Sequence, residues 1–359
     1  MTGKSLGTVV VTGGAGFIGC ALSQMLAPLA ERWIAVDSLN PRVHASPERP
    51  AQLHEAATLV VGDIRDASVW RRVVSDVPPE VVIHLAAETD TGLSLNAVTR
   101  FSDVNATGTA IMLDAFGEAD ILPSHLLVAS TRAVYGEGQW REQSTGHVFT
   151  PGQRTHGQLA RGQWDFPGAT PMASASSDTA VRPTSIYGAT KFAQESMMSA
   201  WAGGRGVPFT ALRLQNVYGR GQSLINPYTG ILPLFAQAAA RGQAIDVYED
   251  GLMSRDFVHI DDVARAFADA VGHPPDVSRV TDIGCGRPAT VLEVARLVAD
   301  VVGGPMPRVS GRFRDGDVRH AWCSTDQAAD TLGWRPEVPW ETGIAEYARW
   351  VLESAEARG

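Results

Sequence analysis

A short apolar run followed by a glycine-rich turn lies near the start of the chain and restricts its fold more than any other feature. Residues 8–12 read TVVVT and residues 13–19 read GGAGFIG. Glycines at Gly13, Gly16 and Gly19 permit a tight turn, a close approach of the backbone to a pyrophosphate, and close packing of a helix on a strand. The helix that begins here would direct unpaired N–H groups at the phosphates. The pattern predicts a strand, a dinucleotide-binding turn and a helix.

Further apolar runs alternate with segments of helical length along the chain. This alternation is typical of a parallel sheet with crossover helices, and runs this continuous suit strands that are buried on both faces. Strands are predicted over 8–12, 33–36, 58–61, 81–85, 125–129, 209–214 and 280–283. Helices are predicted over 17–29, 66–76, 103–119, 187–202, 261–271, 290–302 and 341–354. We predict an α/β fold, a doubly wound parallel Rossmann sheet with a smaller mixed α/β C-terminal substrate lobe.

The predicted division of the chain follows from the same pattern. The Rossmann domain takes residues 1–215, and residues from about 250 to 285 complete its sheet. Residues 216–249 and 286–359 form the substrate lobe. Residues 138–183 are rich in Gly, Pro, Ser, Thr and Gln and show neither structural period, which predicts a long loop or flap. This insertion is either a lid near the ligand pocket or a peripheral surface loop.

Charge and cysteine content exclude several classes of function. The net charge is −9 and no run of Lys or Arg occurs, which argues against binding to nucleic acid or to an anionic membrane. The three cysteines have no paired metal-ligand spacing, so we predict no metal site and a reducing compartment. The apolar stretch over 9–22 is interrupted by four glycines and is too short to span a bilayer. We therefore expect the chain in the cytoplasm.

Two carboxylates follow predicted strands at positions that suit a dinucleotide. Asp37 closes the second strand 24 residues after Gly13, near the spacing expected for a carboxylate on the adenosine ribose. Because a carboxylate repels a 2′-phosphate, Asp37 favours NAD over NADP. Asp63 ends the third strand, where it either bonds the adenine or caps a helix. His84 and the small residues that follow it close the fourth strand, which suits a backbone lying against the cofactor.

Tyr187 and Lys191 lie four residues apart, hence on one face of a predicted helix. A free tyrosine has a pKa of about 10, so a tyrosine that acts as a base near neutral pH needs that pKa lowered. The ammonium of Lys191 and the positive nicotinamide ring of bound NAD would together lower it. The alternative interpretation is an ordinary surface helix. Thr131 directly follows the fifth strand, at the sheet edge where open α/β folds bind ligands.

These residues occur in the order typical of extended short-chain dehydrogenases/reductases, which the chain resembles over almost its whole length. Within that group it resembles the NAD-dependent nucleotide-sugar epimerase/dehydratase family. The nearest branches are UDP-galactose 4-epimerase-like enzymes and, more closely, dTDP-L-rhamnose 4-epimerase-like enzymes. The closer match rests on DSLNPRVH at 37–44, STRAVYGEG at 130–138 and GQSLINPYTG at 221–230.

The resemblance implies a set of site residues. Catalysis would fall to Thr131, Tyr187 and Lys191. The NAD-binding residues would be Gly13, Gly16, Phe17, Ile18, Gly19, Asp37, Asp63, Ile64, Leu85, Ala86, Ala87, Asn105 and Lys191. The substrate would contact Thr89, Thr91, Thr131, Asn216, Arg255 and Arg314, the last three at its diphosphate. Guanidinium groups suit phosphate because they make paired, charge-assisted bonds. The alternative for Arg255 and Arg314 is surface ion pairing.

The two residues after Thr131 restrict which of the family's reactions the chain could catalyse. The 4,6-dehydratases that the chain resembles carry Thr-Asp-Glu where it has Thr131-Arg132-Ala133. Elimination of water needs an acid and a base, which Arg132 and Ala133 do not offer. The resemblance therefore implies an isomerase of carbohydrate biosynthesis, a 4-epimerase that inverts C4 of a nucleotide sugar through a 4-keto sugar with bound NAD.

Three alternatives stay open. They are a nucleotide-4-keto-sugar reductase, the 4,6-dehydratase, and a non-catalytic NAD-binding sensor. A reductase of this kind usually consumes NADPH, which Asp37 disfavours. The family also implies a homodimer built from the helices predicted over 103–119 and 187–202.

Overall fold

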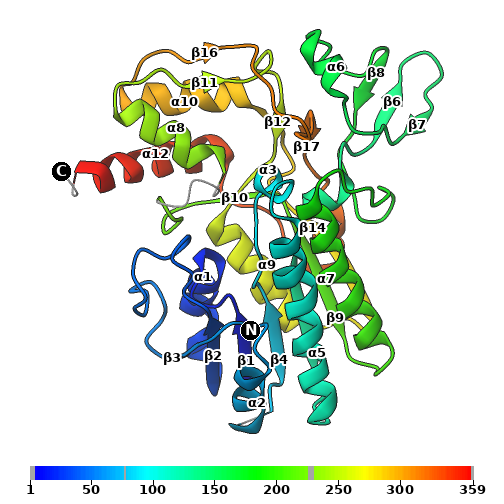
Figure 1. Cartoon of the computed structure of the whole chain (residues 1–359), viewed down its shortest axis with the longest axis vertical. Helices are drawn as coiled ribbons and strands as arrows, with labels where there is room; N and C mark the ends of the chain where they lie inside the picture. Colours follow the sequence, from blue (N-terminus) through cyan, green and yellow to red (C-terminus); the bar gives the residue numbers. More distant parts are fainter. Residues whose placement is uncertain (1–4, 77, 225–229, 357–359) are drawn as a thin grey trace.

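The main sheet has seven parallel strands in the order β14-β9-β5-β4-β1-β2-β3 (Figure 1). A computed structural model describes residues 5–76, 78–224 and 230–356. The strands are β1 (Thr8–Thr12), β2 (Arg32–Asp37), β3 (Ala57–Val61), β4 (Val81–His84), β5 (His125–Thr131), β9 (Phe209–Leu214) and β14 (Ser278–Ile283). Each lies within two residues of its predicted bounds, and the doubly wound Rossmann sheet is confirmed. Strand order reverses between β1 and β4, the position at which such sheets bind ligands.

Helices cover both faces of this sheet. One layer holds α1 (Phe17–Leu26), α9 (Ile260–Gly272) and α11 (Asp326–Leu332), and the other holds α2 (Ala67–Asp76), α5 (Gly108–Glu118) and α7 (Ile186–Gly203). Successive strand residues point to opposite faces. Val9 and Val11 therefore pack in the layer of α1 and α9, whereas Val10 packs in the layer of α2 and α5. This two-sided burial explains why the strands are continuously apolar.

The helix that leads into α5 is longer and less regular than predicted. It begins as α4 (Val98–Ser102), widens into a π-helical segment, η2 (Asp103–Thr107), and continues as α5. Short π segments in helices are rare and frequent at functional sites. Here the segment carries the buried side chain of Asn105. The short α3 (Thr91–Ser94) precedes α4.

The C-terminal lobe has its own hydrophobic core, formed mainly by α8 (Ile231–Ala240), α10 (Val291–Val302) and α12 (Trp340–Glu356). Its strand pairs are β10 (Asn216–Tyr218) with β13 (Phe257–His259), and β11 (Asp246–Val247) with β16 (Arg308–Val309). A third small sheet places β12 (Ser254–Arg255) between β15 (Ala289–Thr290) and β17 (His320–Ala321). The mixed lobe is confirmed. The sequence analysis missed α8, whose Pro233 lies in the first turn, where its missing N–H breaks no helical hydrogen bond.

The insertion over residues 138–183 is folded, so the prediction of a loop was wrong. Strands β6 (Trp140–Glu142), β7 (Val148–Phe149) and β8 (Ala169–Pro171) form an antiparallel sheet, and α6 (His156–Ala160) lies beside them (Figure 1). These strands are very short, and their pairing depends on residues distant in sequence. The described residues also contain two 3-10 turns, η1 (Ala27–Leu29) and η3 (Arg132–Tyr135).

A buried ion network joins the insertion to the substrate lobe. Arg154 donates from Nε to Glu137 Oε1 (3.1 Å) and from Nη1 to Glu249 Oε2 (2.9 Å). Arg319 donates from Nη1 to the same Glu249 oxygen (3.0 Å) and from its backbone N–H to Glu137 Oε2 (2.8 Å). The four side chains are at most 1% exposed. The insertion is therefore anchored in the body of the protein. No helix among the described residues combines the length and apolarity needed to cross a membrane.

Candidate active site

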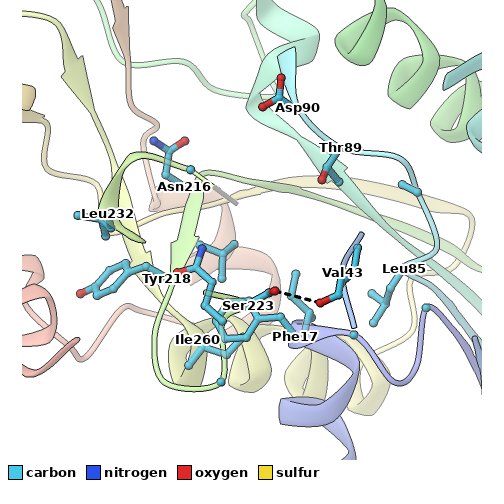
Figure 2. A pocket seen from close by; sticks show the side chains of 18 of the residues that line it. Phe17, Val43, Leu85, Thr89, Asp90, Asn216, Tyr218, Ser223, Leu232 and Ile260 are labelled. Atoms are coloured by element: carbon cyan, nitrogen blue, oxygen red, sulfur yellow. Dashed lines mark hydrogen bonds between the residues drawn. The ribbon is translucent and has the colours of Figure 1, made fainter. Parts of the chain in front are cut away.

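A cavity of about 2300 Å³ lies between the Rossmann sheet and the lobe. Single-ligand pockets usually measure about 300–1,000 Å³, so this cavity has room for two sizeable ligands. Figure 2 shows Thr89 and Asp90, from the segment after β4, on the wall together with Asn216 from β10. On the opposite side Ser223 Oγ donates to Val43 O (2.9 Å), which joins the lobe to the segment after β2 (Figure 2).

The glycine turn forms one wall of the cavity and fits a pyrophosphate. Gly13 has φ +63°, and a Cβ there would lie 2.9 Å from Ala86 N, so only glycine is accommodated. Helix α1 starts after Gly16, and no side chain among the described residues caps it. The first N–H groups of a helix have no intrahelical partners either, so those of α1 are left without a partner from a cap or from the helix. The cavity is lined here by Gly13, Gly16, Phe17, Ile18 and Gly19. The glycine turn thus presents open backbone to the cavity, as the predicted phosphate cradle requires.

Asp37 lies on the same wall and is held in place by two backbone groups. Its Oδ2 accepts from Ala15 N (3.1 Å) and its Oδ1 accepts from Leu39 N (2.9 Å). His44 Nε2 lies 3.5 Å from Oδ1. The carboxylate is 8% exposed and borders the cavity at the end of β2. This placement fits the predicted contact with a ribose that carries a free 2′-hydroxyl.

Asp63 also lines the cavity, but its carboxylate is paired within its own loop. Arg65 Nη2 donates to Asp63 Oδ2 (2.6 Å), and this bond lowers the pKa of Asp63. Helix α2 begins at Ala67, and Asp66 accepts from the Ser68 N–H (2.8 Å). The helix-cap interpretation of Asp63 was therefore wrong. The remaining predicted cofactor contacts on the wall are Ile64, Leu85, Ala86 and Ala87.

Asn105 is not on the cavity wall, which corrects its prediction as a cofactor contact. Its Oδ1 accepts from Glu88 N (2.7 Å), and its Nδ2 donates to Glu88 O (3.0 Å) and Thr190 Oγ1 (3.0 Å). The side chain is fully buried, and the protein itself uses its hydrogen-bonding groups. Asn105 therefore holds the segment after β4 against α7.

Lys191 also lies behind the wall. Its Nζ donates to Gln194 Oε1, and the Gln194 amide in turn donates to Ala86 O (3.2 Å). Burial lowers the pKa of Lys191 to about 7, opposed by the negative charge of Glu195. The ammonium is thus directed at Gln194. The expectation that it acts on Tyr187 is not what this structure shows.

Tyr187 and Thr131 both line the cavity. Tyr187 lies in the first turn of α7, which Ser185 caps by accepting from Gly188 N (3.0 Å). A Cβ on Gly188 would lie 2.4 Å from Ala133 O, so glycine lets α7 approach the end of β5 closely. Burial raises the pKa of Tyr187, whereas hydrogen bonding by Thr131 and the positive charge of Arg132 act to lower it.

The predicted diphosphate ligands come from two strands and a loop of the lobe. Asn216, on β10, accepts from Arg132 Nε (3.0 Å) at its Oδ1. Arg255, on β12, is buried and donates to Ser254 O (2.7 Å) and Val318 O (2.7 Å). The surface ion pair considered for Arg255 is therefore absent. Arg314 is exposed and its guanidinium lies 5.3 Å from the centre of the Tyr248 ring.

All of the predicted substrate contacts border the one cavity. They are Thr89, Thr91, Thr131, Asn216, Arg255 and Arg314. The motif over 221–230 is only partly visible, because residues 225–229 lie outside the described part of the chain.

Sequence reasoning missed several charged residues of the wall, among them Asp90 and Arg132 beside the proposed catalytic residues. Asp90 has φ +109° and accepts from Leu93 N (2.5 Å) at the start of α3. A non-glycine residue with such a φ is strained and is a common feature of binding sites. Arg132 was noted only as a residue that cannot support dehydration. Nothing in the sequence signals that Asp90 adopts a positive φ, whereas Arg132 could have been found from its position beside Thr131.

Comparison with known proteins gives a consistent assignment. Residues 9–156 and 165–284 match the NAD dependent epimerase/dehydratase family. The dTDP-L-rhamnose 4-epimerase of Burkholderia thailandensis is 48% identical over 98% of this chain and 96% of its own. The UDP-glucose 4-epimerase of Thermus thermophilus, solved with NAD, is 26% identical with a TM-score of 0.76, covering 96% of this chain and 98% of its own. The UDP-glucose 4-epimerase of Thermotoga maritima, solved with UDP-glucose, is also 26% identical with a TM-score of 0.76, covering 97% and 99%. The chain belongs to the NAD dependent epimerase/dehydratase family, as its sequence motifs predict.

Proposed function

We propose that the protein is an NAD-dependent 4-epimerase of dTDP- or UDP-hexoses. One observation carries the proposal. Tyr187 and Thr131 border the same cavity as the glycine turn on one side and Asn216 on the other. A dinucleotide and a sugar diphosphate would therefore meet at the tyrosine. A dTDP-6-deoxyhexose is the first substrate to try, because the 48% identical relative is named for dTDP-L-rhamnose.

The residues of the first wall fit NAD. A Cβ at Gly13 would fill the space between the turn and Ala86, and Asp37 offers a fixed carboxylate at the end of β2. The uncapped start of α1 supplies N–H donors for a pyrophosphate. Bound NAD would accept a hydride from C4 of the sugar and return it.

The chain's own residues supply the acid–base chemistry and the positioning. Tyr187 Oη, as phenolate, takes the proton from the 4-hydroxyl while Thr131 hydrogen-bonds the same oxygen and steadies the developing carbonyl. Asn216, Arg255 and Arg314 hold the diphosphate, about which the 4-keto sugar turns to present its other face. Tyr187 then returns the proton. Catalysis thus requires one group that gains one proton at its oxygen and then gives it back.

The alternatives have less support at the site. Arg132 and Ala133 line the cavity beside Thr131, where dehydratases of this family carry an acid pair. The fixed carboxylate of Asp37 disfavours the NADPH that a ketoreductase usually consumes. A non-catalytic sensor would need neither Tyr187 beside Thr131 nor a cavity with room for a second ligand.

The test is incubation with a panel of dTDP-, UDP- and GDP-hexoses, including dTDP-L-rhamnose, followed by NMR of the sugar ring. One substrate carries deuterium at C4. We expect inversion at C4 without added NADH, and deuterium retained at C4 of the product. A requirement for stoichiometric NADH or NADPH would identify a reductase, and formation of a 4-keto-6-deoxy product would identify a dehydratase. Either result would contradict the proposal.

Cofactor preference should respond to Asp37. In Asp37→Asn one acceptor oxygen is replaced by an NH₂ group that faces a backbone N–H. We therefore expect about tenfold weaker NAD binding, together with a smaller preference for NAD over NADP. Calorimetric titration of both dinucleotides measures the two effects. Asp63→Asn is the matched control, because it changes a cavity carboxylate paired with Arg65 and should leave the preference unchanged. Equal preference in Asp37→Asn and the wild type would rule out this role.

We further propose that residues 216–249 and 286–359, joined by the strands β12 and β13, form the nucleotide-sugar lobe and that the enzyme acts in the cytoplasm. A homodimer would form through α5 and α7, and sedimentation analysis of the purified chain tests it.

A further inference from the structure

The insertion over residues 138–183 has no part in the proposed mechanism. All of it lies in the described part of the chain, and none of its residues borders the cavity. It is not a peripheral loop either, because Arg154 is buried and bonds to Glu137 and Glu249. Any effect of the insertion on the site must therefore pass through a neighbouring segment.

The neighbouring segment is the loop over residues 310–318, between β16 and β17, named here the Arg314 loop. Arg312, Arg314 and Asp317 of this loop border the cavity. The guanidinium groups of Arg312 and Arg314 lie 5.0 and 5.3 Å from the centre of the Tyr248 ring, which belongs to the lobe. The Arg314 loop therefore carries charged side chains of the cavity wall, among them a proposed diphosphate ligand.

The residues between and after these arginines contact the insertion instead. The Phe313 ring lies edge to face with the His156 ring, with centroids 5.4 Å apart, and its centroid is 6.2 Å from that of Trp164. Asp315 Oδ2 lies 3.0 Å from His156 Nδ1. Side chains alternate between the two sides of an extended segment. The arginines accordingly turn to the lobe, while Phe313 and Asp315 turn to the insertion.

The insertion also holds the backbone of the Arg314 loop. Arg154 Nη2 donates to Asp317 O (2.8 Å). Gly316 has φ +88°, and a Cβ there would lie 3.3 Å from Gln153 Nε2, so the turn of the loop passes close to the insertion. The loop is thus contacted by the insertion at its main chain as well as at its side chains.

We propose that the insertion is a brace that holds the Arg314 loop in the position in which it binds the diphosphate of the substrate. Arg314 is exposed, and the entropy lost when an exposed loop is ordered by a ligand opposes binding. Contacts that His156 and Trp164 make in advance reduce this loss. The inference rests on the proposed function, because it takes the loop as part of the nucleotide-sugar site. It gives the insertion a positioning role.

His156→Ala tests the brace with little risk to the fold, because the side chain is 71% exposed. The substitution removes the ring contact with Phe313 and the contact with Asp315. The Kd values of dTDP and UDP, measured by calorimetry, should rise about fivefold, the order expected when one more side chain must be ordered on binding. The KM of the sugar nucleotide should rise similarly while kcat stays within about twofold, since binding is lost and Tyr187 is untouched.

His147 provides the matched control. It is an exposed histidine of the same insertion, and its ring stacks on Phe149 with centroids 6.5 Å apart, a contact made within the insertion. His147→Ala should leave KM, kcat and nucleotide affinity unchanged. Phe313→Ala removes the loop's side of the contact with His156. The double variant should therefore lose less affinity than the product of the two single losses, because both substitutions remove one shared contact.

Limited proteolysis reports on the loop without turnover. Trypsin cleaves after arginine, and Arg312 and Arg314 are both exposed. Cleavage within a folded protein requires local opening of the chain. Cuts after these two arginines, identified by mass spectrometry, should be several-fold faster in His156→Ala and Phe313→Ala than in the wild type. His147→Ala should be cut as slowly as the wild type, and thermal unfolding checks that each variant is folded.

Unchanged cleavage after the two arginines in His156→Ala would overturn the proposal, as would equal effects of His156→Ala and His147→Ala. A fall in kcat with KM unchanged would also overturn it, because the insertion would then act on the chemical step and not on binding. If the wild type bound neither dTDP nor UDP and epimerised no hexose, the proposed function would fail. The proteolysis would still decide whether the insertion holds the Arg314 loop.

Discussion

Tyr187→Phe should lower the epimerase kcat about a thousandfold, because the phenol oxygen is the group that takes and returns the substrate proton. The ring itself would remain. It contacts Phe101 edge to face with centroids 6.4 Å apart, and phenylalanine preserves that contact. NAD content and the midpoint of thermal unfolding should therefore match the wild type. The measurement is initial-rate epimerisation of the substrate found in the panel.

A second buried tyrosine provides the matched control. Tyr135 donates to Asp282 Oδ1 (2.9 Å) and accepts from Arg213 Nη1 (2.9 Å), and it does not border the cavity. Tyr135→Phe should lower stability while kcat stays within a few-fold of the wild type. If Tyr187→Phe kept more than a tenth of the activity, the acid–base role would be wrong, and a non-catalytic NAD-binding sensor would gain support.

Arg154→Met should lower the free energy of unfolding by about 3–5 kcal/mol, because it removes a buried cation from two buried carboxylates that then keep only their bonds to Arg319. Those carboxylates are Glu137 at the start of the insertion and Glu249 in the lobe. The same arginine also donates from Nη2 to Asp317 O (2.8 Å), in the segment that carries Arg314. Urea denaturation of the wild type and the variant measures the loss.

An exposed pair gives the comparison for this prediction. Arg287 and Glu341 are joined by a 2.7 Å contact, with side chains 64% and 43% exposed. Arg287→Met should cost at most about 1 kcal/mol, since solvent already screens the pair. Similar losses in the two variants would mean that the buried network does not anchor the insertion.

Local sequence pattern predicted the sheet and the cofactor wall well. Short, mostly apolar runs between segments of helical length mark the buried parallel strands, and all seven strands were predicted in this way. The glycine turn was also predictable from the sequence, because Gly13 has a positive φ and lies close to Ala86, and both features require glycine. The insertion was misread because its strands have two or three residues each, too few to show a period.

By itself the sequence determined the Rossmann sheet, the dinucleotide turn and the residue types of the catalytic group, because each depends on neighbours a few positions away. The tertiary structure alone decided which side chains face the cavity. It turned Asn105 toward Glu88, directed Lys191 at Gln194, and joined Arg132 to Asn216. These outcomes depend on hydrogen bonds and charges between segments far apart in the chain, whose partners no local period specifies.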